Sequence, residues 1–299
     1  MQKQVISLIF LAILFSFKSY SQDLENLLDS EMKPTTDYTT ATFKSTRVLN
    51  GHSIERMQKG QLDFRISHRF GLLNTGAYNL WGLDQANIHF SLEYGVTNWL
   101  MFGLGRGTYQ KAYDGFIKLS ILRQSKGAVK MPISLSYFGS IYDNTITPLI
   151  PNETSYPSSR LSFVHQLLIA RKFNDYLSIQ LSPTYLHDNL VPTALDSNDK
   201  FAVGVGGRIK LTKRVTINAE YYYVIHPPRY VPSVQTYNPL AIGFDIETGG
   251  HVFQIIFTNS LAMVEKGFIG ETSGQWLKGD VHLGFNISRV FTLDNPKKK

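Results

Sequence analysis

The chain of 299 residues contains no cysteine. This absence excludes disulfides, thiolate metal sites and a cysteine nucleophile. It also means that hydrogen bonds and packing alone hold the fold. Beyond the first twenty or so residues there is no run of about eighteen apolar residues, which excludes a membrane protein built from transmembrane helices.

Concentrated charge of one sign is also missing. The formal net charge is +7, but the basic residues are scattered along the chain, apart from Lys297, Lys298 and Lys299 at its end. A nucleic-acid-binding protein needs a basic face with aromatic side chains that stack on bases, so we expect no nucleic-acid partner. The mean hydropathy is only slightly negative. That value suits a soluble protein, and equally a barrel whose lipid-facing and lumen-facing residues average out.

What the chain does have is alternation. In residues 200–224, apolar Phe201, Val203 and Val205 alternate with small or polar residues, and a polar turn at 212–214 is followed by a second alternating arm. A period of two over about ten residues indicates a half-buried strand rather than a helix. Each arm is about as long as a tilted strand must be to cross a bilayer.

The same unit repeats along the chain and predicts about twelve strands. The first begins at Gln61, and the others cover approximately 87–94, 99–109, 115–123, 132–142, 159–173, 176–186, 200–211, 215–224, 239–248, 251–259 and 280–291. Their connections alternate between short turns and long loops rich in Pro, Asn and Ser, as in outer-membrane barrels. We therefore predict an all-β fold, a closed antiparallel transmembrane β-barrel of about twelve strands with a short N-terminal arm. The alternative, a soluble lipocalin-like barrel or jelly roll, would have an apolar inner face.

The remaining segments give the domain boundaries. Residues 1–21 have the basic start, apolar core and small-x-small end of a cleaved signal peptide. Residues 22–60 are predicted to be an N-terminal periplasmic arm or plug, in which 23–32 suits a short helix and 41–49 is a weak strand candidate; a disordered leader is the alternative. Residues 61–291 are predicted to form the barrel, and residues 292–299 a basic tail.

The predicted inner faces carry charges of both signs. They are candidate lumen-lining residues: Asp63, Arg65, Arg69, Glu93, Lys118, Arg208, Lys210, Glu220, Asp245 and Glu247. Charges inside a membrane protein must be paired or hydrated. Two interpretations follow: a network of ion pairs that fills a narrow barrel, or a polar path for solutes whose constriction these residues set. A barrel of this size lies between filled small barrels and open porins, so strand number does not decide between them.

Evidence for catalysis or cofactors is weak. His89 and Ser91 share one strand face, a spacing that resembles outer-membrane phospholipase A, but the Ser-Asn-Gly continuation of that enzyme is replaced by Leu92, Glu93 and Tyr94. A serine nucleophile also needs a third, orienting group. The eight histidines are dispersed and form no pair with zinc-site spacing. We expect no enzyme, no metal and no cofactor.

Three blocks carry a family resemblance: TFKSTRVLNGHSIE at 42–55, QLDFRISHRFG at 61–71, and the segment 82–107. They resemble an uncharacterised family of Bacteroidota outer-membrane β-barrel proteins, known only as a domain of unknown function. The resemblance implies a barrel in the outer membrane, and it supplies no activity and no catalytic residues. Phe291, at the end of the last strand, resembles the C-terminal signal read by the barrel-assembly machinery, although residues 292–299 follow it.

Taken together, the sequence predicts a monomeric, non-enzymatic protein of the bacterial outer membrane. Its expected partners are outer-membrane lipid, the barrel-assembly machinery during biogenesis, and small polar solutes that pass through a narrow pore. A plugged barrel that acts as a scaffold or a surface-interaction protein is the first alternative. A lipid hydrolase using Ser91 and His89 is the second.

Overall fold

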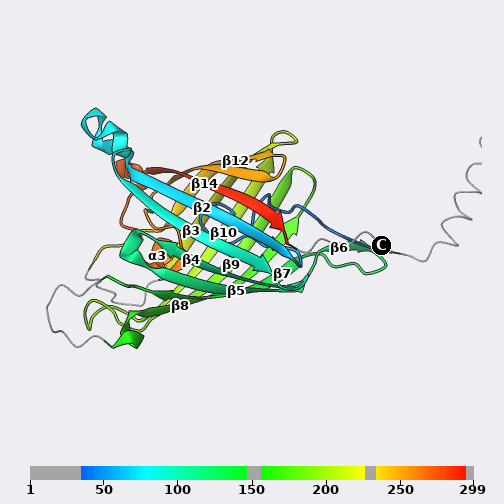
Figure 1. Ribbon diagram of the computed structural model, residues 1–299, viewed down its shortest axis with the longest axis horizontal. Coiled ribbons are helices and arrows are strands. Elements are labelled where there is room, and N and C mark those ends of the chain that lie inside the picture. The colour runs from blue at the N-terminus through cyan, green and yellow to red at the C-terminus, as the bar shows by residue number, and fades with distance from the viewer. Residues whose placement is uncertain (1–34, 147–155, 226–233, 294–299) are drawn as a thin grey trace, which may run out of the picture. The chain divides into compact units, whose positions relative to one another are not determined.

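The computed structural model describes residues 35–146, 156–225 and 234–293. Twelve strands form a closed barrel in which every neighbouring pair is antiparallel (Figure 1). The strands are β2 (Gln61–Leu72), β3 (Ala86–Gly95), β4 (Leu100–Gly107), β5 (Tyr113–Leu122), β7 (Ser134–Asp143), β8 (Leu161–Lys172), β9 (Leu177–Asp188), β10 (Asp199–Lys210), β11 (Val215–Ile225), β12 (Leu240–Thr248), β13 (His251–Thr258) and β14 (His282–Thr292). The prediction of a closed barrel of about twelve strands is confirmed.

The last strand closes the barrel against the first. Strand β14 pairs with β2 from Thr292 opposite Gln61 to His282 opposite Leu72, with one irregularity between His282 and Gly284. Lipid offers no hydrogen-bond partners, so an open sheet edge would leave main-chain groups unsatisfied in the membrane. Pairing of β14 with β2 removes both edges.

Side chains alternate across the wall as the period of two predicts. On β2 and β3 the outward-facing Phe64, Phe90 and Leu92 are exposed, whereas the intervening Arg65 and Glu93 are buried. Register pairs match like with like, for example Phe64 opposite Leu92 and Asp63 opposite Glu93. One face of each strand is therefore apolar and turned outward, and the other points into the barrel.

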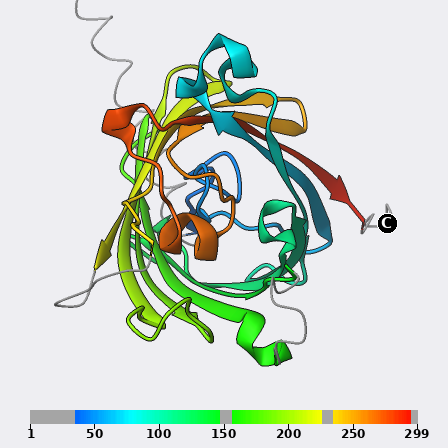
Figure 2. The same cartoon turned by 90° about the vertical axis from the view of Figure 1, so that its left-hand side faces the viewer.

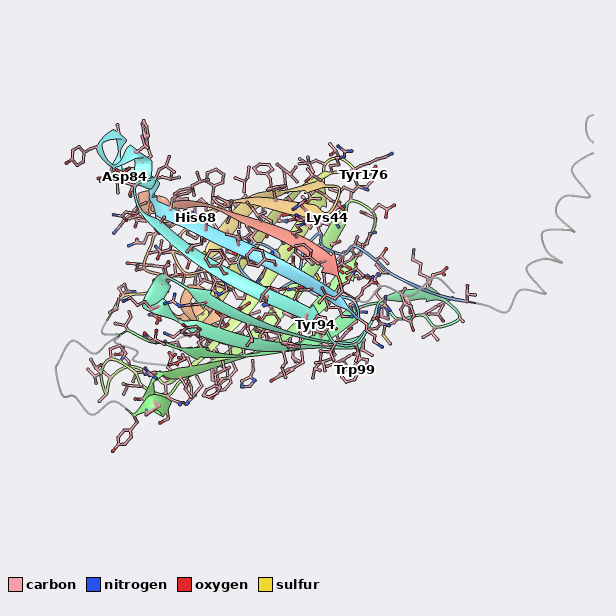
Figure 3. The ribbon with its side chains drawn as sticks, in the orientation of Figure 1. Lys44, His68, Asp84, Tyr94, Trp99 and Tyr176 are labelled. Atoms are coloured by element: carbon pink, nitrogen blue, oxygen red, sulfur yellow. The ribbon has the colours of Figure 1, made fainter. Side chains whose placement is uncertain are left out.

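Connection length differs between the two ends of the barrel, with one exception. Short turns at 96–99, 173–176, 211–214 and 249–250 lie at one end, and loops such as 73–85, 189–198 and 259–281 lie at the other. The exception is 123–133, which lies at the short-turn end and carries β6. Short turns are typical of the periplasmic side. In Figure 3, Tyr94, Trp99 and Tyr176 lie at the short-turn end, and Asp84 lies at the long-loop end. The turn Gly249-Gly250 has φ values of +45° and +130°, backbone angles that glycine adopts readily.

Smaller elements complete the described chain. β1 (Thr36–Tyr38) pairs with β6 (Ser125–Gly127) in a separate two-stranded sheet. The long loops carry η2 (Leu73–Thr75), η3 (Ala77–Gly82), η4 (Tyr109–Lys111), η5 (Pro157–Arg160), α3 (Glu265–Gly270) and η6 (Trp276–Lys278). Within the described ranges, no helix combines the length and apolarity needed to span a bilayer. The predicted signal peptide, the helix at 23–32 and the tail beyond residue 293 lie outside the described residues.

The segment 41–58 runs inside the barrel (Figure 2, blue). It turns back on itself, with Val48 N–H donating to Gly51 O at 2.8 Å and a single bridge between Arg47 and His52. We call this segment the lumen hairpin. The weak strand prediction for 41–49 is wrong, because apart from that bridge these residues make no ladder.

The barrel interior also contains an apolar cluster. Phe43, Val48 and Ile54 of the lumen hairpin pack with inward-facing wall residues, which are Met101, Phe116, Phe138, Leu168 and Ala170. Glycine makes room for these larger side chains, since a Cβ added to Gly103 would lie 2.2 Å from the ring of Phe116. The ring of Phe116 therefore occupies space that any side chain at position 103 would need.

We expect Gly103→Val to lower the free energy of unfolding by about 1–3 kcal/mol, the usual cost of overpacking. Urea unfolding in lipid vesicles measures it. Gly207→Val is the matched control, because nothing lies within 4 Å of a Cβ added there. Phe116→Ala combined with Gly103→Val should cost less than the sum of the two single substitutions, because the added side chain fills the space that the ring leaves. Equal effects of the two glycine substitutions would contradict the packing argument.

Candidate functional site

The structure places the ten candidate residues in two groups. Asp63, Arg65, Arg69, Glu93, Lys118, Arg208, Glu220 and Asp245 are buried on the inner side of the wall. Lys210 and Glu247, near the short-turn end of the barrel, are only partly buried. Glu247 accepts a hydrogen bond from Lys44, at the start of the lumen hairpin (Figure 3).

A charged cluster joins β2 and β3 to the lumen hairpin. Arg65 bonds Asp63 at 2.9 Å, and Arg47 of the hairpin lies 2.9 Å from Glu93 Oε1. Thr46 Oγ1 donates to Glu93 Oε2 at 2.7 Å. A buried charge without a partner is costly. Within the wall, Arg65 also lies 3.5 Å from Glu93 Oε1 and so serves both carboxylates. Arg47 and Thr46 of the hairpin give Glu93 two further partners.

Cationic wall residues bind carbonyl groups of the hairpin. Lys118 Nζ donates to the carbonyl oxygens of Ser53 at 3.0 Å and Glu55 at 2.8 Å. Arg208 donates to the carbonyl oxygens of Ala41 at 2.7 Å and Thr42 at 2.9 Å. These bonds satisfy main-chain acceptors that have no ladder partner.

The hairpin tip is held by an acidic residue. Glu220 Oε1 accepts from the N–H of Asn50 at 2.6 Å, and both of its carboxylate oxygens accept from the N–H of Gly51 at 3.2–3.3 Å. Arg69 donates to Asn50 Oδ1 at 2.7 Å. The Tyr222 hydroxyl lies over Gly51, where an added Cβ would come within 2.2 Å of it, so the tip must be glycine.

Neutral amides complete the contact. Asn286 Nδ2 donates to Leu49 O at 2.9 Å, and Gln254 and Asn218 both donate to Val48 O. Gln254 also donates to Asp245 Oδ1 at 2.9 Å. Asp245 is therefore linked to the hairpin through Gln254, which donates to both Asp245 and Val48 O.

A long loop meets the hairpin from the opposite end. Helix α3, between β13 and β14, lies in the barrel mouth (Figure 2, orange). Its Glu265 accepts from the N–H of His52 at 3.2 Å and from the Tyr142 hydroxyl at 3.0 Å. Burial raises the pKa of the Glu265 carboxyl, although the nearby Arg47 and these hydrogen bonds act in the opposite direction. The hairpin is thus enclosed between the wall and α3.

The His89 and Ser91 side chains do not pair with each other. His89 Nε2 lies 2.6 Å from Asp114 Oδ1, and Ser91 Oγ lies 3.5 Å from Glu93 Oε1. Both residues are buried on the inner face. Within the part of the chain that the structure describes, no group of three or more His, Asp or Glu side chains is arranged to hold a metal ion.

Several residues of this site were not predicted from the sequence. Arg47, Thr46, His52 and Glu265 lie in segments without periodicity, so no pattern placed them in the barrel. Three further residues, the inward-facing amides Asn218, Gln254 and Asn286, lie on predicted strands. The alternation along those strands already indicated that their side chains point into the barrel. Amides on an inner face suggest main-chain partners.

Residues 43–291 match a family described as a membrane bound beta barrel domain (DUF5777). Among solved structures, the NanC porin has 8% identity and a TM-score of 0.47, covering 78% of this chain and 100% of that one. The COG4313 outer membrane channel from Pseudomonas putida F1 has 9% identity and a TM-score of 0.49, covering 80% of this chain and 98% of that one. Identities and TM-scores this low carry no statement about the function of this chain. No curated protein matches the sequence.

The family match extends over nearly the whole barrel, from the lumen hairpin to Phe291. It confirms the prediction of a membrane-bound β-barrel of a family without assigned function. Transmembrane barrels of this kind are outer-membrane proteins, so the match supports the predicted location. The chain belongs to the membrane-bound β-barrel domain family DUF5777.

Proposed function

We propose that this protein is an outer-membrane channel for small polar solutes and that the lumen hairpin closes it in the state described. The observation that carries the proposal is the chemistry of the inner wall. Its charged and amide side chains bind mainly main-chain atoms of the hairpin, as Lys118, Arg208 and Glu220 do. Water and polar solutes can take the place of such main-chain groups.

The connection of the hairpin to the barrel supports withdrawal toward the periplasm. The hairpin continues into β2 through Gly60, whose N–H donates to Gly95 O at 2.9 Å at the short-turn end. Lys44 and Glu247 meet near the same end. Both arms of the hairpin can therefore leave through one mouth of the barrel while the wall stays intact.

The closed state is strongly favoured. Phe43, Val48, Leu49 and Ile54 of the hairpin are at most 6% exposed. Burying each such side chain contributes about 1.5–3 kcal/mol. Full withdrawal is therefore rare in the resting protein, and we expect brief, infrequent openings rather than a steady porin-like conductance.

The same proposal assigns the remaining partners. Lipid contacts the outward-facing apolar residues, such as Phe64, Leu104 and Val205, which are exposed. Phe291, in β14, is exposed and lies 5.0 Å from the guanidinium of Arg289, an accessible position for the assembly machinery. No enzymatic activity is proposed. The Bacteroidota origin and the cleaved signal peptide stay predictions.

A disulfide that fixes the hairpin to the wall should abolish conductance. A Cβ added to Gly206 would lie 3.8 Å from Val48 Cβ, the separation typical of disulfide-linked residues. The absence of native cysteine makes Val48→Cys with Gly206→Cys the only thiol pair. We expect oxidised protein to be silent in planar bilayers and reducing agent to restore openings.

The matched control is a disulfide within the wall. A Cβ added to Gly107 would lie 3.9 Å from His89 Cβ on the neighbouring strand, so His89→Cys with Gly107→Cys joins β3 to β4 without touching the hairpin. Its openings should match those of the unmodified protein. Undiminished conductance in the oxidised hairpin variant would contradict the proposal.

Weakening the contact at the hairpin tip should have the opposite effect. Glu220→Gln replaces a carboxylate that accepts from two main-chain N–H groups. A charge-assisted bond of this kind contributes about 1.5–3 kcal/mol, so we expect the open probability to rise about tenfold or more. Asp84→Asn, the same chemical change on an exposed outer loop (Figure 3), is the control. Sealed bilayers for both variants and for the unmodified protein would favour the scaffold alternative.

A further inference from the structure

A cavity of about 550 Å³ lies at the long-loop end of the barrel. We call it the outer vestibule. Its lining includes Tyr109 and Gln110 of η4, Asp188 and Lys200 at the ends of β9 and β10, and Lys266 and Glu271 at α3. The volume falls in the range of small-molecule sites, and convergent polar groups are typical of such sites.

Two ion pairs line the outer vestibule. Lys200 Nζ lies 2.9 Å from Asp188 Oδ2, and their side chains are 19% and 8% exposed. Lys266 pairs with Glu271, with side chains 13% and 24% exposed. Each cation therefore has an anion beside it in a partly desolvated space. The third carboxylate of the lining, Asp196, accepts from the Thr193 N–H at 3.0 Å and from the Thr193 hydroxyl at 2.8 Å.

The two pairs are close neighbours. A Cβ added to Gly270 would lie 3.5 Å from Lys200 Nζ, and the next residue along the chain is Glu271. The lysine of one pair thus lies beside the backbone that carries the acid of the other.

Neutral donors fix the orientation of Glu271. The Tyr109 hydroxyl donates to Glu271 Oε2 at 3.3 Å, and Gln110 Nε2 donates to the same oxygen at 3.0 Å. Burial and the adjacent carboxylate raise the pKa of the Tyr109 hydroxyl, so it remains a donor at physiological pH. Glu271 is held in place rather than free to follow Lys266.

We infer that the outer vestibule is a binding site for a small zwitterionic solute, such as a free amino acid or a dipeptide. The inference rests on the proposed channel function and names its substrate class. A zwitterion can present its carboxylate to Lys200 or Lys266 and its ammonium to Asp188 or Glu271. Such a solute can replace the partner of a lysine and the partner of a carboxylate at the same time, so no member of the two ion pairs is left alone in a partly desolvated space. A solute with a single charge would leave one group of a pair without a partner, which is costly.

The position of α3 makes this site relevant to the closed lumen. Lys266 and Glu271 at α3 line the vestibule, while Glu265 of the same helix contacts the N–H of His52 in the hairpin. Helix α3 therefore contacts both the vestibule, where the solute would bind, and the lumen hairpin, which closes the path.

Binding is tested by isothermal titration calorimetry on the full chain in detergent, with the lumen hairpin locked by the Val48→Cys and Gly206→Cys disulfide. Locking separates binding from opening. The probes are glycylglycine, acetate, methylammonium and glucose. We expect saturable binding of glycylglycine and at least tenfold weaker binding of the other three. Equal binding of acetate or glucose, or no binding of glycylglycine, would overturn the inference.

Substitution identifies the site. Lys266→Gln with Glu271→Gln removes one pair while keeping side-chain size and net charge, and should weaken glycylglycine binding at least tenfold. Asp143→Asn breaks a more exposed pair with Arg160 at the outer end of β7, which does not line the vestibule, and should leave binding unchanged. Equal effects of the two variants would place binding elsewhere. Binding that survives in a protein without conductance would keep the vestibule site and refute only the channel.

Discussion

A chain segment without regular secondary structure inside a membrane barrel must find partners for its main-chain groups, and the rest of this structure follows from that constraint. The wall supplies those partners. Glu220 binds amide hydrogens at the tip of the lumen hairpin, and Lys118 and Arg208 bind its carbonyl oxygens. An unpaired main-chain group in such an interior costs about as much as a lost hydrogen bond. The polar side chains of the inner faces therefore satisfy the main-chain groups that the irregular hairpin leaves without ladder partners.

The sequence predicted the barrel because its signal is local and repeated. Alternation with a period of two fixes which face of each strand meets lipid, and turns such as Gly249-Gly250 fix where strands reverse. The inner positions of Asp63, Arg65, Glu93 and their counterparts follow directly from that register. Closure is then required by the absence of hydrogen-bond partners in lipid.

The sequence offered a plug or a periplasmic arm for residues 22–60 without deciding between them, and it did not place α3. Neither segment has a periodic pattern, and contacts with distant strands position both. Glu220 and Gly51 are 169 residues apart, and Glu265 and His52 are 213 apart. The apolar lumen cluster was missed for a related reason. Met101, Phe116 and Phe138 lie on otherwise polar or glycine-rich faces. A single apolar residue on such a face does not indicate a cluster, because its packing partners Phe43 and Ile54 belong to the hairpin.

The barrel thus has three parts in series: an outer vestibule lined by two ion pairs, a short helix, and a hairpin inside the lumen. Helix α3 is shared, with Glu265 turned to the hairpin and Lys266 and Glu271 at the vestibule. This arrangement explains how a polar, charged interior can coexist with a closed barrel. On the proposed channel function, the step that admits a solute is the withdrawal of residues 41–58 and not a change in the wall.

Hydrogen–deuterium exchange of the unmodified protein in lipid nanodiscs tests the central claim most directly. If the wall binds the hairpin main chain, the amides of Asn50, Gly51 and His52 exchange slowly, as amides of the neighbouring strands do, and far faster once Glu220 is replaced by Gln. Exchange of these three amides at the rate of an exposed loop such as 73–85 would contradict the account.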